Sequence, residues 1–263
     1  MIVHLYAPCW NEEKMLPFFL RHYSSWVDRF FIFDDGSTDD TLDILADNPK
    51  VEIHRLVRSD PNSLALSIRD FPEISWKASR GKADWIVATK IDEHFYHPSI
   101  RSYLEDCRER GVTLIPGLGY QMMTDDFPQT DELLCKTRTM GVPWVQMNKL
   151  GIFDPNQIEE TNFAPGRHSA APTGQVVLPE DDELLMLHYK YLGIDYTHSR
   201  HLQCRPSQGK KDQEHGWGHK WRWDFNELQA DWDKFSALTV DIAEPDSKHC
   251  EEHAAPRWWR ISK

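Results

Sequence analysis

The sequence is poor in cysteine and lacks the motifs of several common kinds of site. Five cysteines occur among 263 residues, an odd number with no CxxC pair, which favours reduced thiols in a cytosolic protein and gives no zinc-finger spacing. No GxGxxG follows an apolar run, no GxxxxGKS/T occurs, and neither GxSxG nor HExxH is present. A P-loop is therefore excluded, and a dinucleotide site of the Rossmann type has little support.

Positive charge and long apolar runs are also scarce. The net charge is -12, so binding of nucleic acid through its phosphates is disfavoured. No stretch approaches the ~20 apolar residues that a membrane-spanning helix needs. The chain opens directly on a strand-like segment, Ile2–Ala7, and not on a basic region followed by an apolar one. We expect a cytoplasmic protein, free or peripheral to the inner face of the membrane, without a nucleic-acid partner.

The first 95 residues alternate short apolar runs with segments of helical spacing. Runs such as Phe30–Phe33 and Trp85–Ala88 are apolar throughout, as in strands that are buried on both faces. Between them, Leu16, Phe19 and Leu20 recur at helical spacing, and Pro17 fits the first turn of that helix. This alternation predicts an α/β fold with a mostly parallel sheet that is flanked by helices.

Acidic residues follow two of these predicted strands. Asp34 and Asp35 end the first run and Gly36 permits a tight turn, while Asp92 and Glu93 follow the second run. In open α/β sheets ligands bind beyond the carboxyl ends of the strands, where carboxylates hold a divalent metal or accept hydrogen bonds from a base or ribose. The competing interpretation is that both pairs only cap the turns that follow.

The second half of the sequence is less regular. We expect a helix over Ile100–Glu109, a strand over Val112–Ile115, and a long loop rich in turn formers over residues 127–182. The apolar run Leu184–Leu192 holds His188, which by itself is more typical of a packed histidine than of a ligand. Beyond residue 201 lies a tail rich in tryptophan, with a helix over Asn226–Leu238.

Four segments together resemble the family 2 glycosyltransferases. They are Asn11-Glu12-Glu13, the segment Asp28–Thr41 that reads DRFFIFDDGSTDDT, and the later pair Asp84–Pro98 and Leu185–Gly193, which read DWIVATKIDEHFYHP and LMLHYKYLG. The resemblance, to a bacterial subgroup, covers roughly residues 1–200. It implies a GT-A-type, Rossmann-like fold in which residues 1–98 bind the nucleotide and 99–200 bind the acceptor. Residues 201–263 would then be a helical, tryptophan-rich extension.

The resemblance also implies roles for individual residues. Pro8, Asn11 and Glu12 would lie beside the nucleotide. Asp35, with Gly36, would bind the nucleobase. Asp92, the second Asp of a DxD motif, would face the metal and diphosphate, and His188 would supply a late contact to metal or phosphate.

The DxD motif departs from its pattern at Lys90, which stands where the first Asp is expected. A lysine removes one negative charge and adds a positive one, so a bound Mg²⁺ or Mn²⁺ is in question. Lys90 could contact the diphosphate as a point charge and partly replace a cation. An ion pair between Lys90 and a neighbouring carboxylate is the alternative.

The resemblance implies an inverting glycosyltransferase of hexosyltransferase type. It would move a sugar from a UDP- or GDP-sugar to a glycan or lipid-linked acceptor, for example in synthesis of a surface polysaccharide. A carboxylate must deprotonate the acceptor hydroxyl, and we expect Asp125 or Asp126 in this catalytic role. The tryptophans of the tail would pack on the domain, form a homo-oligomer contact or stack on sugar rings. Two alternatives stay open: a sugar nucleotidyltransferase, and a catalytically silent module that binds a nucleotide or glycan.

Overall fold

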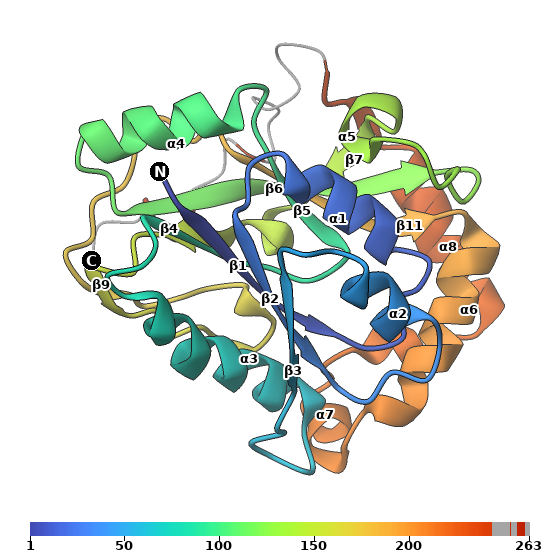
Figure 1. Cartoon of the computed structure of the whole chain (residues 1–263). Coiled ribbons are helices and arrows are strands. Elements are labelled where there is room, and N and C mark those ends of the chain that lie inside the picture. Colours follow the sequence, from blue (N-terminus) through green and yellow to red (C-terminus); the bar gives the residue numbers. More distant parts are fainter. Residues whose placement is uncertain (244–252, 254–256, 261–263) are drawn as a thin grey trace.

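The computed structural model describes residues 1–243, 253 and 257–260. Its centre is a mixed sheet flanked by helices (Figure 1), which confirms the predicted α/β class. Four parallel strands, in the order β3-β2-β1-β4, form one half of this sheet. They are β1 (Val3–Cys9), β2 (Arg29–Asp34), β3 (Val51–Arg55) and β4 (Trp85–Ala88). Because these strands are parallel, their carboxyl ends lie along one edge.

The other half of the sheet is largely antiparallel. β8 (Lys149–Phe153) pairs with β4 and with β6 (Leu114–Thr124), and β6 pairs with β7 (Met140–Pro143). The remaining strands are β5 (Glu93–Tyr96), β9 (Ile158–Glu160), β10 (Thr173–Gly174), β11 (Leu185–Leu192) and β12 (Val240–Asp241). Of these, β11 runs parallel to β6 and antiparallel to β5, with His188 opposite Gln121 and Glu93. This pairing brings the late apolar run next to the acidic segment after β4.

The helices cover the faces of the sheet and its far end. They are α1 (Leu16–Ser24), α2 (Thr41–Ala46), α3 (Leu64–Ser75), α4 (Ile100–Glu109), α5 (Leu134–Thr137), α6 (Ile194–Cys204), α7 (Lys210–Glu214) and α8 (Phe225–Ser236), with 3₁₀ turns η1 (Trp76–Ser79), η2 (Val145–Met147), η3 (Pro165–Arg167), η4 (Arg205–Ser207) and η5 (His219–Arg222). Pro17 stands in the first turn of α1, as predicted. None of the described helices is long and apolar enough to span a bilayer.

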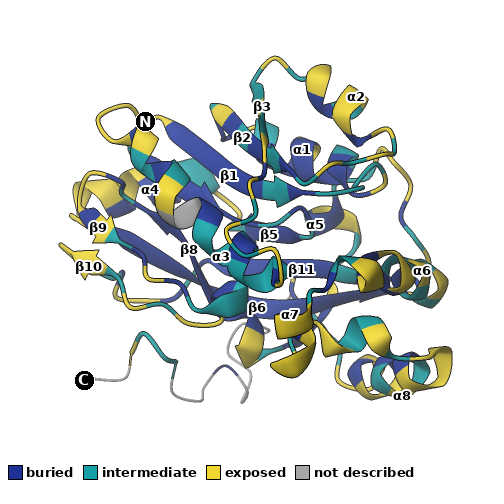
Figure 2. Ribbon diagram, turned by 90° about the horizontal axis from the view of Figure 1, so that it is seen from below, coloured by how far each residue is buried: buried dark blue, intermediate teal, exposed yellow. Residues whose placement is uncertain are grey.

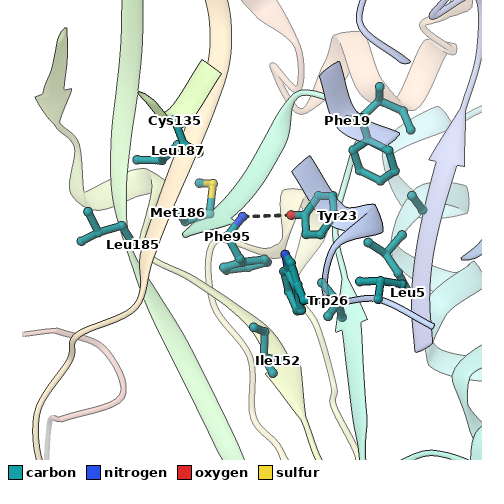
Figure 3. Packing of buried hydrophobic residues seen from close by; sticks show 14 of the residues in the cluster. Leu5, Phe19, Tyr23, Trp26, Phe95, Cys135, Ile152, Leu185, Met186 and Leu187 are labelled. Carbon is teal, nitrogen blue, oxygen red and sulfur yellow. Dashed lines mark hydrogen bonds between the residues drawn. The ribbon is translucent and has the colours of Figure 1, made fainter. Parts of the chain in front are cut away.

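Alternation along β1 divides the interior into two cores on opposite faces of the sheet. Leu5 points to the larger core, which holds α1 and α4, whereas Tyr6 points to the smaller one beneath α3. Tyr23 of α1 fixes the larger core to β5, because its hydroxyl accepts a hydrogen bond from the backbone N–H of Phe95 at 2.9 Å (Figure 3). Figure 2 shows that the strands of this centre are buried, while α7 and α8 have exposed outer faces.

Several predicted details are wrong. The strand that was expected to end at Ile115 continues to Thr124. Gly119 lies inside this strand because a Cβ there would stand 2.3 Å from the backbone of Met147, which packs directly on it. The expected irregular loop 127–182 contains β7 and β8 of the main sheet. Cys250 lies outside the described residues, and the other four cysteines are free and buried.

Candidate active site

The turn after β2 is built by Asp34. Its carboxylate accepts hydrogen bonds from the backbone N–H of Gly36 at 2.9 Å and of Ser37 at 3.0 Å, and from the Ser37 hydroxyl at 2.5 Å. Gly36 has φ of 82°, a conformation that glycine adopts at little cost. Asp34 is only 7% exposed, so all of its hydrogen-bonding capacity serves the turn. The two adjacent aspartates therefore have different roles, because the Asp35 carboxylate contacts Arg58 and not the turn.

Asp35 forms an ion pair with Arg58, a residue that sequence reasoning missed. Nη2 of Arg58 lies 2.6 Å from Oδ2 of Asp35, and Nε lies 3.1 Å from Oδ1, so the guanidinium grips both oxygens. The hydrogen bonds to Asp35 raise the pKa of Arg58. Arg58 follows β3, the strand beside β2, and a basic residue just past a neighbouring parallel strand was the available signal.

Asn11 and Glu12 interlock with the same turn. The N–H of Asn11 donates to the Ser37 hydroxyl at 2.8 Å, and the Asn11 side chain accepts the N–H of Thr38 at 2.7 Å. The N–H of Glu12 donates to the Thr41 hydroxyl at 2.7 Å. The loops after β1 and β2 therefore form one hydrogen-bonded unit, in which Asn11 has φ of 49°.

Arg200 of α6 ties this unit to the end of β11. Its guanidinium lies 2.5 Å from a Glu12 oxygen and donates to the carbonyls of Trp10 at 2.9 Å and Asn11 at 2.8 Å. Burial raises the pKa of Glu12 to about 7, although Arg200 acts in the opposite direction. Arg200 was also missed, because nothing in its local sequence connects it with a loop 188 residues earlier.

A shallow depression lies where β1 and β4 end. Its lining includes two predicted substrate-binding residues, Pro8 and Lys90. The remaining lining residues are Tyr6, Ile68, Phe71, Ala88, Thr89 and Arg167. The position agrees with the general rule that ligands of open α/β sheets bind beyond the strand ends.

Asp92 and His188 form the next part of the site. Nε2 of His188 lies 3.3 Å from Oδ2 of Asp92, and Nδ1 lies 2.8 Å from Oε1 of Gln121. The Gln121 amide nitrogen donates to two backbone carbonyls, those of Met122 and His188, so Oε1 is the atom that faces the imidazole. An amide oxygen only accepts, and therefore Nδ1 of His188 carries the proton.

Neighbouring charges keep Asp92 ionised. Burial alone would raise the pKa of Asp92, but the positive charge that His188 carries when protonated and the charges of Lys90 and Lys190 hold this pKa well below its usual range. Burial lowers the pKa of His188. A neutral His188 with its proton on Nδ1 turns the lone pair of Nε2 toward a carboxylate oxygen. A cation between these two atoms would remove the repulsion, so the pair fits a divalent metal whose other ligands come from phosphates and water.

Glu93 serves a different purpose from Asp92, although the two were predicted together. Its buried carboxylate lies 2.7 Å from Nζ of Lys149 and also contacts the guanidinium of Arg167, which donates to the carbonyl of Ala88 as well. Burial would raise the pKa of Glu93, and the two cations lower it instead. Burial lowers the pKa of Lys149 to about 8. This ion-paired triad holds Arg167 against the depression, and neither cation could be assigned to it from sequence.

Asp125 and Asp126 lie at the end of β6, and both are exposed. Asp126 forms an ion pair with Arg138 at 2.8 Å, and 61% of its side chain is exposed. Asp125 lies four positions after Gln121, in the bend that follows β6, so both aspartates belong to a segment other than the one that holds Asp92 and Glu93. Their catalytic role stays a prediction.

Several other charged and aromatic side chains have structural roles. Within the described part of the chain, no three His, Cys, Asp or Glu side chains cluster as a metal would require, so Asp92 and His188 supply two ligands at most. Lys77 is paired with Glu160, and Arg80 donates to backbone carbonyls of residues 155, 158 and 159, as solvated or structural cations do. Trp221 of η5 lies over Lys190, with the Lys190 Nζ 5.8 Å from the ring centre.

Comparison with known proteins gives only distant similarities. No protein-family model and no curated sequence matches the chain. Among solved structures it is similar to S. aureus TarS, with 11% identity and a TM-score of 0.38, over 77% of this chain and 40% of TarS. The structure of TarS 1-349 in complex with UDP-GlcNAc gives 11% identity and a TM-score of 0.38, over 77% of this chain and 65% of that one.

A third similar structure is glucosyl-3-phosphoglycerate synthase from Mycobacterium tuberculosis, in complex with Mn²⁺, UDP and phosphoglyceric acid. Its identity is 21% and its TM-score 0.32, over 45% of this chain and 43% of the synthase. The chain thus spans about two fifths of the full TarS and of the synthase. Identities and TM-scores this low assign neither an activity nor a substrate to this chain.

Proposed function

We propose that the protein is a glycosyltransferase that moves a sugar from a nucleotide-sugar donor to an acceptor hydroxyl. The observation that carries the proposal is the convergence at one sheet edge of Asp35, Asp92 and His188, with the depression lined by Pro8 and Lys90 between strand ends. These residues belong to the segments whose sequence resembles family 2 glycosyltransferases. A UDP- or GDP-sugar is the donor that such an edge would accept.

In this proposal the nucleoside lies against the loops after β1 and β2. Asp35 accepts a hydrogen bond from the base, and Gly36 lets the backbone approach it closely. Asn11 and Glu12 form the support of this surface, since their hydrogen bonds join its two loops. Arg58 then either recognises the base together with Asp35 or moves aside, because it occupies both carboxylate oxygens now.

Asp92 and His188 would hold a Mg²⁺ or Mn²⁺ ion, if one is used. When bound, the metal supplies positive charge to the diphosphate that leaves. The tautomer fixed by Gln121 presents Nε2 of His188 to that position, and the ionised Asp92 presents an oxygen. Lys90 lines the depression at the ends of β1 and β4, and its ammonium group adds positive charge near Asp92.

The reaction we propose is a single displacement with inversion, catalysed by a carboxylate on the acceptor side. Asp125 or Asp126 would take the proton of the acceptor hydroxyl, while the bond from the anomeric carbon to the diphosphate breaks. The acceptor would be a glycan or lipid-linked sugar, as in synthesis of a surface polysaccharide by an enzyme on the inner face of the membrane. The tryptophan-rich residues after 201 would form a C-terminal extension or a homo-oligomer contact.

A panel of UDP- and GDP-sugars tests the proposal. We expect one donor to raise the melting temperature, and the same donor to be hydrolysed slowly without acceptor and faster with glycan acceptors. The assay is repeated in EDTA and after adding back Mn²⁺ or Mg²⁺, which measures the contribution of a metal. Release of pyrophosphate from a nucleoside triphosphate would show a nucleotidyltransferase instead. Binding of a nucleoside diphosphate without turnover of any donor would show a silent binding module.

A further inference from the structure

Two half-buried lysines of the chain have no oxygen to neutralise them. Six described lysines are buried or half-buried: Lys50, Lys77, Lys90, Lys149, Lys190 and Lys220. Four of them donate hydrogen bonds to carbonyl or carboxylate oxygens of the chain. The side-chain ammonium groups of Lys90 and Lys190 form neither a hydrogen bond nor an ion pair with any described residue. Because a half-buried ammonium loses part of its hydration, such positions are unfavourable unless an anion completes them.

The two unpaired lysines are neighbours of one carboxylate, that of Asp92. Lys90 precedes Asp92 by two residues, at the exit of β4. Lys190 comes from β11, where the N–H of Tyr189 donates to the Asp92 carbonyl at 2.8 Å. Lys190 is therefore next in the chain to a residue that contacts the Asp92 backbone, and it stands two residues after His188. Both lysines act electrostatically on Asp92.

The surroundings add to this positive charge. Lys90, Lys190 and Asp92 carry a formal charge of +1 together. The adjacent triad of Lys149, Arg167 and Glu93 carries another +1, so the region is positive in a protein with a net charge of -12. The Trp221 ring lies over the Lys190 ammonium and limits where it can move. A fixed positive region inside an acidic protein attracts a compact anion.

We propose that Lys90 and Lys190 form a two-lysine clamp that binds the diphosphate of the donor nucleotide. This inference rests on the proposed glycosyltransferase function and assigns Lys190 a role that the sequence did not indicate. The ammonium groups neutralise the diphosphate as it accepts the electron pair of the broken glycosidic bond. The clamp acts in addition to a metal at Asp92 and His188, and it keeps part of the diphosphate affinity when metal is absent.

Isothermal titration calorimetry in EDTA with inorganic pyrophosphate, uridine, UDP and GDP tests the clamp. We expect Lys190→Gln to weaken the binding of pyrophosphate and of the preferred nucleoside diphosphate by about tenfold, and to leave any uridine binding unchanged. Lys190→Arg should retain affinity within about threefold, because it keeps the charge. Lys82→Gln is the matched control, since it removes the same charge from an exposed position before β4.

The possible outcomes test the clamp and the proposed function separately. Unchanged affinity for pyrophosphate in Lys190→Gln, or no pyrophosphate binding by the wild-type protein, would overturn the clamp. An equal loss for uridine and pyrophosphate would also overturn it, since it would indicate general damage, which melting temperatures would reveal. If pyrophosphate binding depends on Lys190 but no sugar nucleotide is turned over, the clamp stands and the proposed function fails. If sugar transfer occurs and Lys190→Gln leaves UDP and GDP affinity intact, the proposed function stands and the clamp fails.

Discussion

At the scale of single residues, neighbours in sequence have opposite surroundings. Asp92 stays near solvent beside an imidazole and two lysines, whereas Glu93 is buried in an ion-paired triad. Successive side chains of an extended segment point to opposite sides, which is sufficient to separate them. Asp34 and Asp35 are divided in the same way, one into a turn and the other toward Arg58.

The catalytic base is the residue assignment that most needs an experiment. We predict that Asp125→Asn lowers kcat for sugar transfer by at least about 100-fold, because an amide cannot take the proton of the acceptor hydroxyl. Donor affinity should not change, since Asp125 is exposed in the bend after β6 and is not among the residues that we propose to bind the donor. Rates are measured with the donor found in the panel, and donor affinity by calorimetry.

Asp126→Asn is the companion variant. Its carboxylate is already neutralised by Arg138, which favours Asp125 as the base of the two. Near-full activity in both variants would remove this pair from the mechanism. Asp182, the buried member of the acidic run 180–182, would be a poor replacement, because Arg257 and Arg260 lie 2.5 Å and 2.8 Å from its oxygens.

Site residues could be predicted from the sequence only where the signal is local. The turn residues Asp34 and Gly36 follow an apolar run directly, so their roles could be predicted from spacing. Arg200 could not, because its partners are distant in sequence and an arginine on a helix usually faces solvent. Arg58 offered only its place just past the strand beside β2, and its partner Asp35 is 23 residues away in sequence. The partners of a buried charge depend on tertiary packing, which local pattern does not encode.

At the scale of elements, α3 is capped from the other end of the chain. Asp212 of α7 accepts hydrogen bonds from the Ser63 hydroxyl at 2.6 Å and from the N–H groups of Leu64 at 2.8 Å and Ala65 at 3.2 Å. These N–H groups open the helix and have no partner within it. Since α3 lines the depression with Ile68 and Phe71, this cap also fixes one wall of the candidate site.

Removing the cap should have a measurable cost. We predict that Asp212→Ala lowers the free energy of unfolding by about 2 kcal/mol, from the lost cap and the buried donors left without partners. Lys211→Ala is the control, since its exposed ion pair with Asp60 should contribute under about 1 kcal/mol. Urea denaturation gives both values. Equal effects in the two variants would show that the Asp212 contacts add little.

Elements with a strong period were predictable, whereas those held by close packing were not. α4 matches the predicted Ile100–Glu109, and α8 covers most of the predicted Asn226–Leu238. β6 was cut short because Pro116 and two glycines resemble a turn. Gly117 and Gly119 are instead required by Phe95 and Met147, which occupy the space of a Cβ. Close approach of packed neighbours and a turn call for the same residue, so sequence alone cannot separate them.

At the scale of the whole molecule, stability depends on histidines that must stay neutral. His22 is buried, stacks on His94 at 4.6 Å between ring centres, and contacts the Phe95 carbonyl at 2.8 Å. Burial lowers the pKa of His22 to about 4 from an ordinary 6.5. Between these values the unfolded chain binds the proton and the folded chain does not. Stability is therefore complete above about pH 6.5 and falls as the pH falls toward 4.

A single variant isolates this effect. We predict that the wild-type protein loses about 2 kcal/mol more stability than His22→Gln between pH 6.5 and pH 5, because each pKa unit corresponds to about 1.4 kcal/mol. Glu12, with its raised pKa, opposes the trend in both proteins and cancels in the comparison. Denaturation at the two pH values measures the difference, and parallel losses in both proteins would contradict the assignment.

The contact between Arg200 and Glu12 also determines when, during synthesis of the chain, the candidate site can form. A ribosome that adds about 5–20 residues per second needs roughly 10–40 s to proceed from Glu12 to Arg200. During most of that time the nascent chain already holds β1 and β2, but the loop after β1 lacks its contact with Arg200. The candidate site is therefore completed late in synthesis, and translation products that end before α6 would lack the contact that anchors this loop.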